Sequence, residues 1–105
     1  MIQKLKDLLG FGPKVNYTEL IANGAAIIDV RTRGEYSSGH VNGSVNIPLD
    51  QIESAVKKFK NKDNPIITCC ASGIRSASAK TYLKNKGFTN VHNGGSWYNV
   101  NKHVD

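Results

Sequence analysis

Apolar stretches that suit buried strands alternate along this chain with stretches that suit amphipathic helices. This alternation limits the fold more than any other feature. Residues 25–30 form a nearly continuous apolar run, as expected for a strand buried on both faces. Other strand signals lie at residues 15–17, 44–47, 66–69 and 91–92. Strands separated by helices imply right-handed crossovers, so the sequence predicts a parallel sheet with helices on both faces.

Helix signals lie between these strands. We expect one brief helix over residues 18–23 and a second that begins at Asp50, with Glu53 completing a capping box. A third helix is expected from Ser76 to a C-cap at Gly87. The second helix has apolar residues at the spacing of one buried face, namely Ile52, Ala55, Val56 and Phe59.

A chain of 105 residues suffices for one hydrophobic core and is too short for two. We expect residues 1–14 to form an N-terminal arm or short helix and residues 15–105 to form the domain. No apolar run approaches the roughly 20 residues that cross a bilayer, and the N-terminus does not resemble a secretory signal. We therefore expect a cytoplasmic protein with no membrane association, and a monomer.

The formal net charge is +6, which raises the question of nucleic-acid binding. Lysines gather at residues 57–62 and again at 80–86, on stretches that suit the solvated faces of helices. There is no arginine-rich patch, zinc finger or aromatic RNA-binding motif. We expect no nucleic-acid partner, and a field that attracts small anions and acidic partners.

The two cysteines, Cys69 and Cys70, are adjacent. Neighbouring strand residues point to opposite faces, so these two cannot form an ordinary structural disulfide without distortion. A strained vicinal disulfide is left as a minor oxidised state. Two cysteines without a matching His or Cys pair also make a poor zinc site, so no metal is expected.

The six-residue run from Cys70 to Arg75 joins the strand at 66–69 to the helix near Ser76. A thiol there faces the N-terminus of a helix, where unpaired amide N–H groups and the helix dipole favour an anion. Gly73 lets the loop turn back on itself, and Arg75 supplies a permanent cation. Such surroundings lower a thiol pKa, so Cys70 is predicted to be a reactive cysteine rather than an inert core thiol.

In a parallel sheet the active site lies beyond the carboxyl ends of the strands. This geometry predicts that Asp29 and Arg31, which follow one strand, lie close to the loop from Cys70 to Arg75, which follows another.

Four motifs in order resemble the rhodanese family. They are Asp29-Val30-Arg31 with Glu35-Tyr36, the stretch from Gly39 to Pro48, the loop Cys70-x-x-Gly73-x-Arg75-Ser76, and Gly94-Gly95 followed by Trp97. The resemblance runs from about Val15 to Tyr98. It implies a single α/β domain around a roughly five-stranded parallel sheet, and sulfurtransferase chemistry at Cys70.

The resemblance also implies a mechanism. Cys70 takes sulfane sulfur from a donor as a persulfide and passes it to a thiol or to cyanide, with no metal or organic cofactor. The binding loop would be Ala71, Ser72, Gly73, Ile74, Arg75 and Ser76, whose amides stabilise the persulfide anion. Related dual-specificity phosphatases have a loop one residue longer, so the length here favours sulfur over phosphate.

Asp29, Arg31 and Trp97 are expected to support the site rather than to act on substrate. Asp29 and Arg31 would brace the loop by ion pairing, and Trp97 would pack near the site. Glu35 and His40 are expected to be structural. Cys69 is interpreted as a strand-core thiol, and under oxidation it is a candidate resolving partner.

Many thiosulfate-preferring relatives have a basic residue where this chain has Ala71. Because of this departure, we expect a persulfide, on a small molecule or on a protein, to be as good a candidate for the donor as thiosulfate. The acceptor is expected to be a thiol, and a sulfur-trafficking protein is one candidate to carry it. Two alternatives stay open. One is a sulfur-carrying or regulatory rhodanese-like module without turnover, and the other is a phosphatase or arsenate reductase on the same scaffold.

Overall fold

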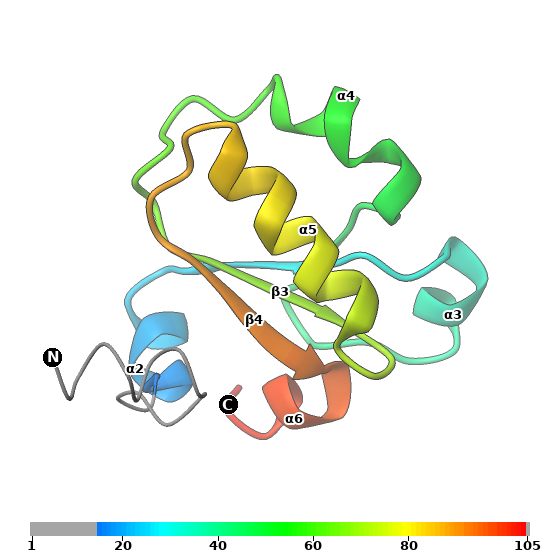
Figure 1. The fold of residues 1–105 in the computed structure, drawn as a ribbon. Coiled ribbons are helices and arrows are strands. Elements are labelled where there is room, and N and C mark those ends of the chain that lie inside the picture. The colour runs from blue at the N-terminus through cyan, green and yellow to red at the C-terminus, as the bar shows by residue number, and fades with distance from the viewer. Residues whose placement is uncertain (1–14, 105) are drawn as a thin grey trace, which may run out of the picture.

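The computed structural model describes residues 15–104, and the region expected to be an N-terminal arm, residues 1–14, lies outside them. Strands and helices alternate along the described chain (Figure 1). The elements in order are α2 (Tyr17–Ala22), β1 (Ala26–Asp29), α3 (Arg33–Ser37), β2 (Val45–Asn46), the 3-10 helix η1 (Leu49–Gln51), α4 (Ile52–Val56), β3 (Ile66–Cys70), α5 (Ile74–Asn85), β4 (Val91–Ser96) and α6 (Trp97–Asn101).

The strands form one parallel sheet in the order β2-β1-β3-β4. It has four strands in residues 15–104 rather than the roughly five expected. The strand expected at residues 15–17 is wrong, because the Asn16 side chain accepts a hydrogen bond from the Glu19 amide and starts α2 at Tyr17. A local cap has therefore overridden a short β-prone segment.

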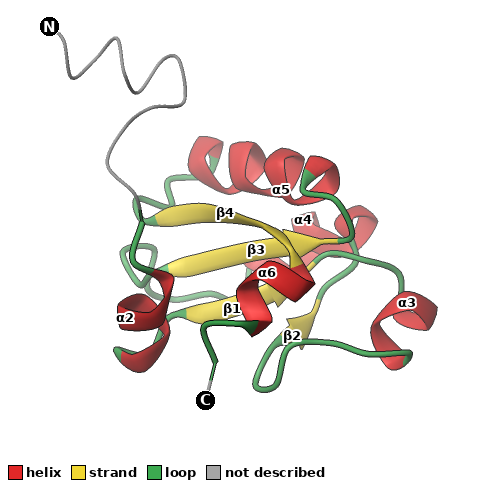
Figure 2. Ribbon diagram, turned by 90° about the horizontal axis from the view of Figure 1, so that it is seen from below, coloured by secondary structure: helices red, strands yellow, loops and turns green. Residues whose placement is uncertain are grey.

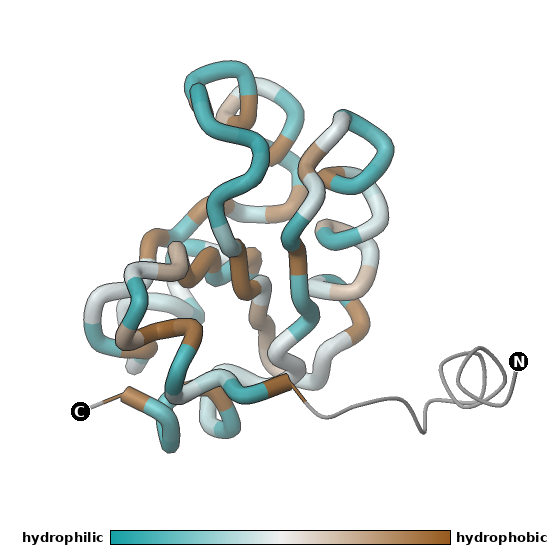
Figure 3. Tube along the Cα trace, turned by 90° about the vertical axis from the view of Figure 1, so that its left-hand side faces the viewer, coloured by the Kyte–Doolittle hydropathy of each residue, from teal (hydrophilic) through white to brown (hydrophobic). Residues whose placement is uncertain are grey.

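Helices cover both faces of the sheet, as predicted (Figure 2). Alternate strand residues point to opposite faces, so Ile28 and Cys70 pack under α4 and α5, whereas Ile67 and Cys69 pack against α2 and α6. All five residues of β3 are buried. Hydrophobic stretches run through the interior, and the outer turns are mostly hydrophilic (Figure 3).

The cap expected at Asp50 is wrong. The chain turns after Pro48 into η1, which contains Asp50, and α4 starts afterwards at Ile52 with no side-chain cap. Proline fixes a φ angle that suits the residue before a helical turn, so the turn begins earlier than the Asp50 signal indicates. The predicted apolar face is nevertheless directed inward, since Ile52 and Val56 are buried.

Two element boundaries differ from the prediction in ways that matter for the site. Helix α5 begins at Ile74 instead of near Ser76, because Gly73 occupies the N-cap with a left-handed φ of +98°. Strand β4 continues to Ser96 and includes Gly94, where a side chain would meet Val100 at 2.5 Å. Over residues 15–104, no helix combines the length and the apolar composition that crossing a bilayer requires.

Candidate active site

The predicted loop lies at the carboxyl edge of the sheet. Cys70 is the last residue of β3 and pairs in register with Ser96 of β4. Helix α3 lies beyond this edge, on the side to which the arrowheads of β3 and β4 point (Figure 1). The left-handed turn at Gly73 brings the loop back against β4, where a Cβ on Gly73 would be 3.2 Å from the Gly95 Cα.

The loop folds around the sulfur of Cys70. The Gly73 amide donates a hydrogen bond to the Cys70 Sγ at 3.0 Å, and the Ser76 Oγ lies 3.4 Å from the same sulfur. Neither Cys70 nor Ser76 has exposed surface, whereas Ala71 and Ser72 are exposed. The thiol is therefore held just beneath the loop, with its hydrogen-bond donors already in place.

Two opposing effects act on the Cys70 thiol. Burial raises its pKa because it disfavours the charged thiolate. Hydrogen bonds from the Ser76 side chain and from the amides of Ser76, Gly73 and Ser72 stabilise the thiolate. The second effect is the larger, and the net result is a pKa below that of an ordinary thiol.

Asn93 of β4 is a site residue that the sequence analysis missed. Its Oδ1 accepts hydrogen bonds from the Ser76 hydroxyl at 2.6 Å and from the Gly95 amide at 3.0 Å. Its Nδ2 donates to the Gly73 carbonyl at 3.1 Å. One amide side chain thus fixes the loop, the start of α5 and the end of β4 in one arrangement. The bond from Gly95 is local, but those with Ser76 and Gly73 join distant segments, so no local motif marks Asn93 as a site residue.

Arg75 is held by Glu35, the second residue that the sequence analysis did not place in the site. Its two terminal nitrogens bond the two carboxylate oxygens at 2.8 and 3.0 Å, which is a bidentate pair. Glu35 is itself placed by a capping box with Thr32 at the start of α3. The Thr-x-x-Glu spacing of residues 32–35 is the sequence signal that predicts this capping box, and with it the position of Glu35. The dominant partner of the Arg75 cation is therefore this carboxylate rather than the thiol.

Asp29 and Arg31 form a buried ion pair with a shortest contact of 2.8 Å. Arg31 also donates to the carbonyls of Glu35, in the middle of α3, and Gly39, just after it, so the pair holds α3 and the turn that follows. The expectation was that this pair would brace the Cys70 loop. Asp29 and Arg31 bond each other, and the Arg31 guanidinium then faces the carbonyls of the α3 segment. The pair is therefore linked to the Cys70 loop only indirectly, through Glu35 and Arg75.

Trp97 lies on the face of the sheet opposite α5. Its ring is under the Arg31 guanidinium, 4.9 Å from ring centroid to Cζ, and a Cβ on Gly39 would approach it to 3.1 Å. Trp97 also packs against the core cluster that contains Cys69, so it supports Arg31 from that face of the sheet. His40 bonds the Tyr36 carbonyl through Nδ1 at 2.8 Å and stacks on the Tyr36 ring, which is a structural arrangement.

The neighbouring thiol, Cys69, is in a different environment. It points to the opposite face of the sheet from Cys70 and has no exposed surface. Burial and the nearby Asp29 carboxylate raise the pKa of Cys69 to about 12. The two adjacent cysteines are therefore opposite in character, and only Cys70 has conditions that favour a thiolate.

Comparison with known proteins decides the family. A model of the rhodanese-like domain matches residues 14–102. The chain belongs to the rhodanese-like family. The rhodanese structure with anions from Escherichia coli is 32% identical, with a TM-score of 0.67, and the match covers 72% of this chain and 91% of that one.

Rhodanese-like relatives carry more than one name. Thiosulfate sulfurtransferase PspE of Escherichia coli is 35% identical over 69 residues, which are 65% of this chain and 66% of PspE. Protein YqhL of Bacillus subtilis is also 35% identical over 69 residues, 66% of this chain, but the match spans only 54% of YqhL. A tRNA uridine(34) hydroxylase of Buchnera aphidicola is 33% identical over 65% of this chain and 23% of its own length. The domain therefore occurs both in small sulfurtransferases and inside larger proteins.

Proposed function

We propose that this protein is a sulfurtransferase that carries sulfane sulfur as a persulfide on Cys70. The observation that carries the proposal is the hydrogen bond from the Gly73 amide to the Cys70 Sγ at 3.0 Å, at the end of a buried strand. A preorganised donor at this position stabilises the thiolate before reaction and the persulfide anion after it. The loop residues Ala71, Ser72, Gly73, Ile74, Arg75 and Ser76 form the binding loop in this proposal.

The reaction takes two displacements. In the first, the Cys70 thiolate attacks the outer sulfur of the donor, and the electron pair of the broken bond leaves with sulfite or with a thiolate. In the second, an acceptor thiolate or cyanide attacks the outer sulfur of the persulfide, and the electron pair returns to Cys70. The covalent intermediate divides one difficult transfer into two easier ones. No metal or organic cofactor takes part in either step.

The donor is proposed to be thiosulfate or a persulfide. Ala71 is exposed next to the sulfur and brings no cation, so a doubly charged donor has no side-chain cation directly after the nucleophile. Arg75 keeps a permanent charge, but Glu35 neutralises much of it at a contact of 2.8 Å. Both features favour a persulfide donor with less charge than thiosulfate. The acceptor is proposed to be a thiol, free or on a sulfur-trafficking protein, and the location to be the cytoplasm.

Intact-mass measurement after incubation with thiosulfate, or with a glutathione persulfide, tests this proposal. We expect an adduct of about 32 Da, one sulfur atom, which a reducing thiol removes. The Cys70→Ser variant should lose the adduct. The matched Cys69→Ser variant should keep it, because Cys69 faces the other side of the sheet. An adduct that survives in Cys70→Ser would refute the assignment of the site.

Steady-state kinetics separate the competing functions. A sulfurtransferase turns over when cyanide or a free thiol is supplied, whereas a carrier module would form the adduct and release it only to a specific partner protein. A phosphatase would instead hydrolyse an aryl phosphate in a Cys70-dependent reaction. Hydrolysis of that phosphate without any sulfur adduct would overturn the proposal.

A further inference from the structure

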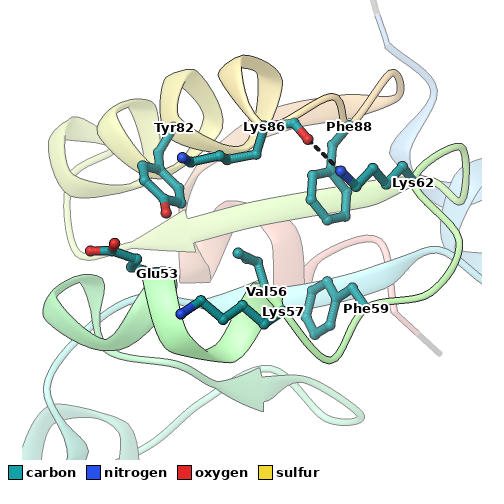
Figure 4. A pocket seen from close by; sticks show the side chains of 8 residues that line it. All are labelled: Glu53, Val56, Lys57, Phe59, Lys62, Tyr82, Lys86 and Phe88. Carbon is teal, nitrogen blue, oxygen red and sulfur yellow. Dashed lines mark hydrogen bonds between the residues drawn. The ribbon is translucent and has the colours of Figure 1, made fainter.

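A cleft of about 370 Å³ lies between α4 and α5, away from the candidate active site. Its lining is mixed in character, with aliphatic and aromatic side chains in the floor and charged side chains around them (Figure 4). The eight lining residues are Glu53, Val56, Lys57, Phe59, Lys62, Tyr82, Lys86 and Phe88. This volume is within the range of small-molecule sites, which are mostly apolar with a few placed polar groups.

One end of the cleft is polar. In Figure 4 the ammonium groups of Lys57 and Lys86 reach toward the end where Glu53 and the Tyr82 hydroxyl lie. The Lys86 Nζ is 5.5 Å from the centroid of the Tyr82 ring. In the described part of the chain the ion pairs are at Arg31 and Arg75, and neither Lys57 nor Lys86 takes part in one. This end therefore presents two cations and one carboxylate.

The other end is apolar. Phe59 and Phe88 meet edge to face with ring centroids 6.0 Å apart, beside Val56. Lys62 has a structural role here, because its Nζ donates to the Lys86 carbonyl at the C-terminus of α5, at 2.7 Å. The Lys62 side chain lines this end of the cleft, and its ammonium lies 5.7 Å from the Phe88 ring centroid.

The cleft is separate from the Cys70 loop. Helix α5 starts at Ile74 beside the loop, and its first residue in the lining, Tyr82, comes eight residues later, about 12 Å along the helix axis. Phe59 and Phe88 lie on the segments that lead into β3 and β4, at the edge of the sheet opposite Cys70. A molecule seated between α4 and α5 would not reach the sulfur.

From the charge and the apolar floor we infer that this cleft binds a small organic anion with an aromatic body, such as an aromatic carboxylate. The ring would lie against the half-buried Phe59 and Tyr82, above the buried Val56 and Phe88, and the carboxylate would face Lys57 and Lys86. Three lysines to one glutamate make the lining cationic by two charges, which complements a monoanion. This binding function is additional to sulfur transfer and does not depend on it.

Titration with naphthoate, followed by amide chemical shifts in NMR, tests the inference. We expect saturable shifts in α4 and in the C-terminal half of α5, in the high micromolar to millimolar range. Naphthamide has the same shape without the charge, and acetate has the charge without the ring. Both should bind more weakly than naphthoate, because each lacks one of the two halves of the site.

Charge variants of the lining should change the affinity for naphthoate in opposite directions. Lys57→Gln and Lys86→Gln should each weaken naphthoate binding by about twofold to fivefold, the range of exposed ion pairs. Glu53→Gln should tighten it by a similar factor, because a repelling carboxylate is removed. Lys84→Gln is the matched control, since Lys84 is an exposed lysine of the same helix outside the lining. It should leave the affinity unchanged.

Several results would overturn the inference. Shifts confined to the Cys70 loop would place the ligand elsewhere, and equal affinities of all four variants would remove the electrostatic argument. Binding of an acidic aromatic peptide without any binding of naphthoate would make the cleft a protein-docking surface instead. Concentration-dependent self-association that buries α4 and α5 would make it an interface between copies. The sulfur adduct on Cys70 tests the enzymatic proposal independently of all these outcomes.

Discussion

Replacement of Ser76 by alanine tests how the protein sets the ionisation of Cys70. The Ser76 Oγ lies 3.4 Å from the Cys70 Sγ and 2.6 Å from the Asn93 Oδ1. A hydroxyl has one proton to donate. In the thiol state it donates to Asn93 and accepts from the thiol, whereas in the thiolate state it must turn toward the sulfur. The Asn93 Oδ1 then keeps its bond from the Gly95 amide at 3.0 Å, so this rotation leaves no buried acceptor without a partner.

The size of the effect follows from these contacts. A hydrogen bond to a charged group contributes about 1.5 to 3 kcal/mol, and one pKa unit corresponds to about 1.4 kcal/mol. The upper limit for Ser76→Ala is therefore about two units. The contact is long and the hydroxyl is shared with Asn93, while the Gly73 amide remains 3.0 Å from the sulfur. We expect the pKa of Cys70 to rise by about one unit.

The assay is the pH dependence of iodoacetamide alkylation, with Cys70 and Cys69 distinguished by peptide mass. Wild-type Cys70 should react at a lower pH than a free thiol does, and the Ser76→Ala profile should move to higher pH. Ser78→Ala is the control, because Ser78 lies two residues along α5 and is exposed. An unchanged profile for Ser76→Ala, or an equal shift for Ser78→Ala, would refute the role of this hydroxyl.

Two further predictions concern stability and are measured by urea unfolding. Gly94→Ala should destabilise the protein by about 1 to 3 kcal/mol, because the new Cβ would meet Val100 at 2.5 Å. The control Gly34→Ala lies in open space within α3 and should be neutral or slightly stabilising, and a large loss there would contradict the packing argument. The bond from Arg75 lowers the pKa of Glu35 from 4.5 to about 2, so the ionised carboxylate stabilises the fold above pH 4.5. The stability difference between wild type and Glu35→Gln should therefore be constant above that pH and disappear as the pH falls to about 2, and a difference that persists there would contradict it.

The period of two along a strand made several features predictable from sequence. It placed Cys69 and Cys70 on opposite faces of β3 before their surroundings were known. The continuous apolar run at residues 25–30 predicted a strand covered on both faces, and β1 has α4 and α5 on one side and α2 and α6 on the other.

Local signals failed where two of them competed. Val15 and Tyr17 have β-prone side chains, yet Asn16 between them accepts a hydrogen bond from the Glu19 amide and a helix forms. Asp50 and Glu53 have capping-box spacing, yet Pro48 starts a turn before the box can form. At Asn16 a completed cap bond outweighs the propensities of single residues. After Pro48 the fixed φ of proline and the bond from the Gln51 amide to the Pro48 carbonyl, at 2.8 Å, start the turn instead.

The amino-acid sequence alone determined the layered α/β architecture, the opposite directions of the two cysteines and the loop around Cys70. Each of these follows from a periodicity or a motif of a few neighbouring residues. Only the tertiary structure decided what holds that loop. Glu35 reaches Arg75 across 40 positions and Asn93 reaches Ser76 across 17, because the order of the strands brings their carboxyl ends to one edge. Hydrogen bonds and ion pairs depend on distance in space, and no local pattern encodes a partner so far along the chain.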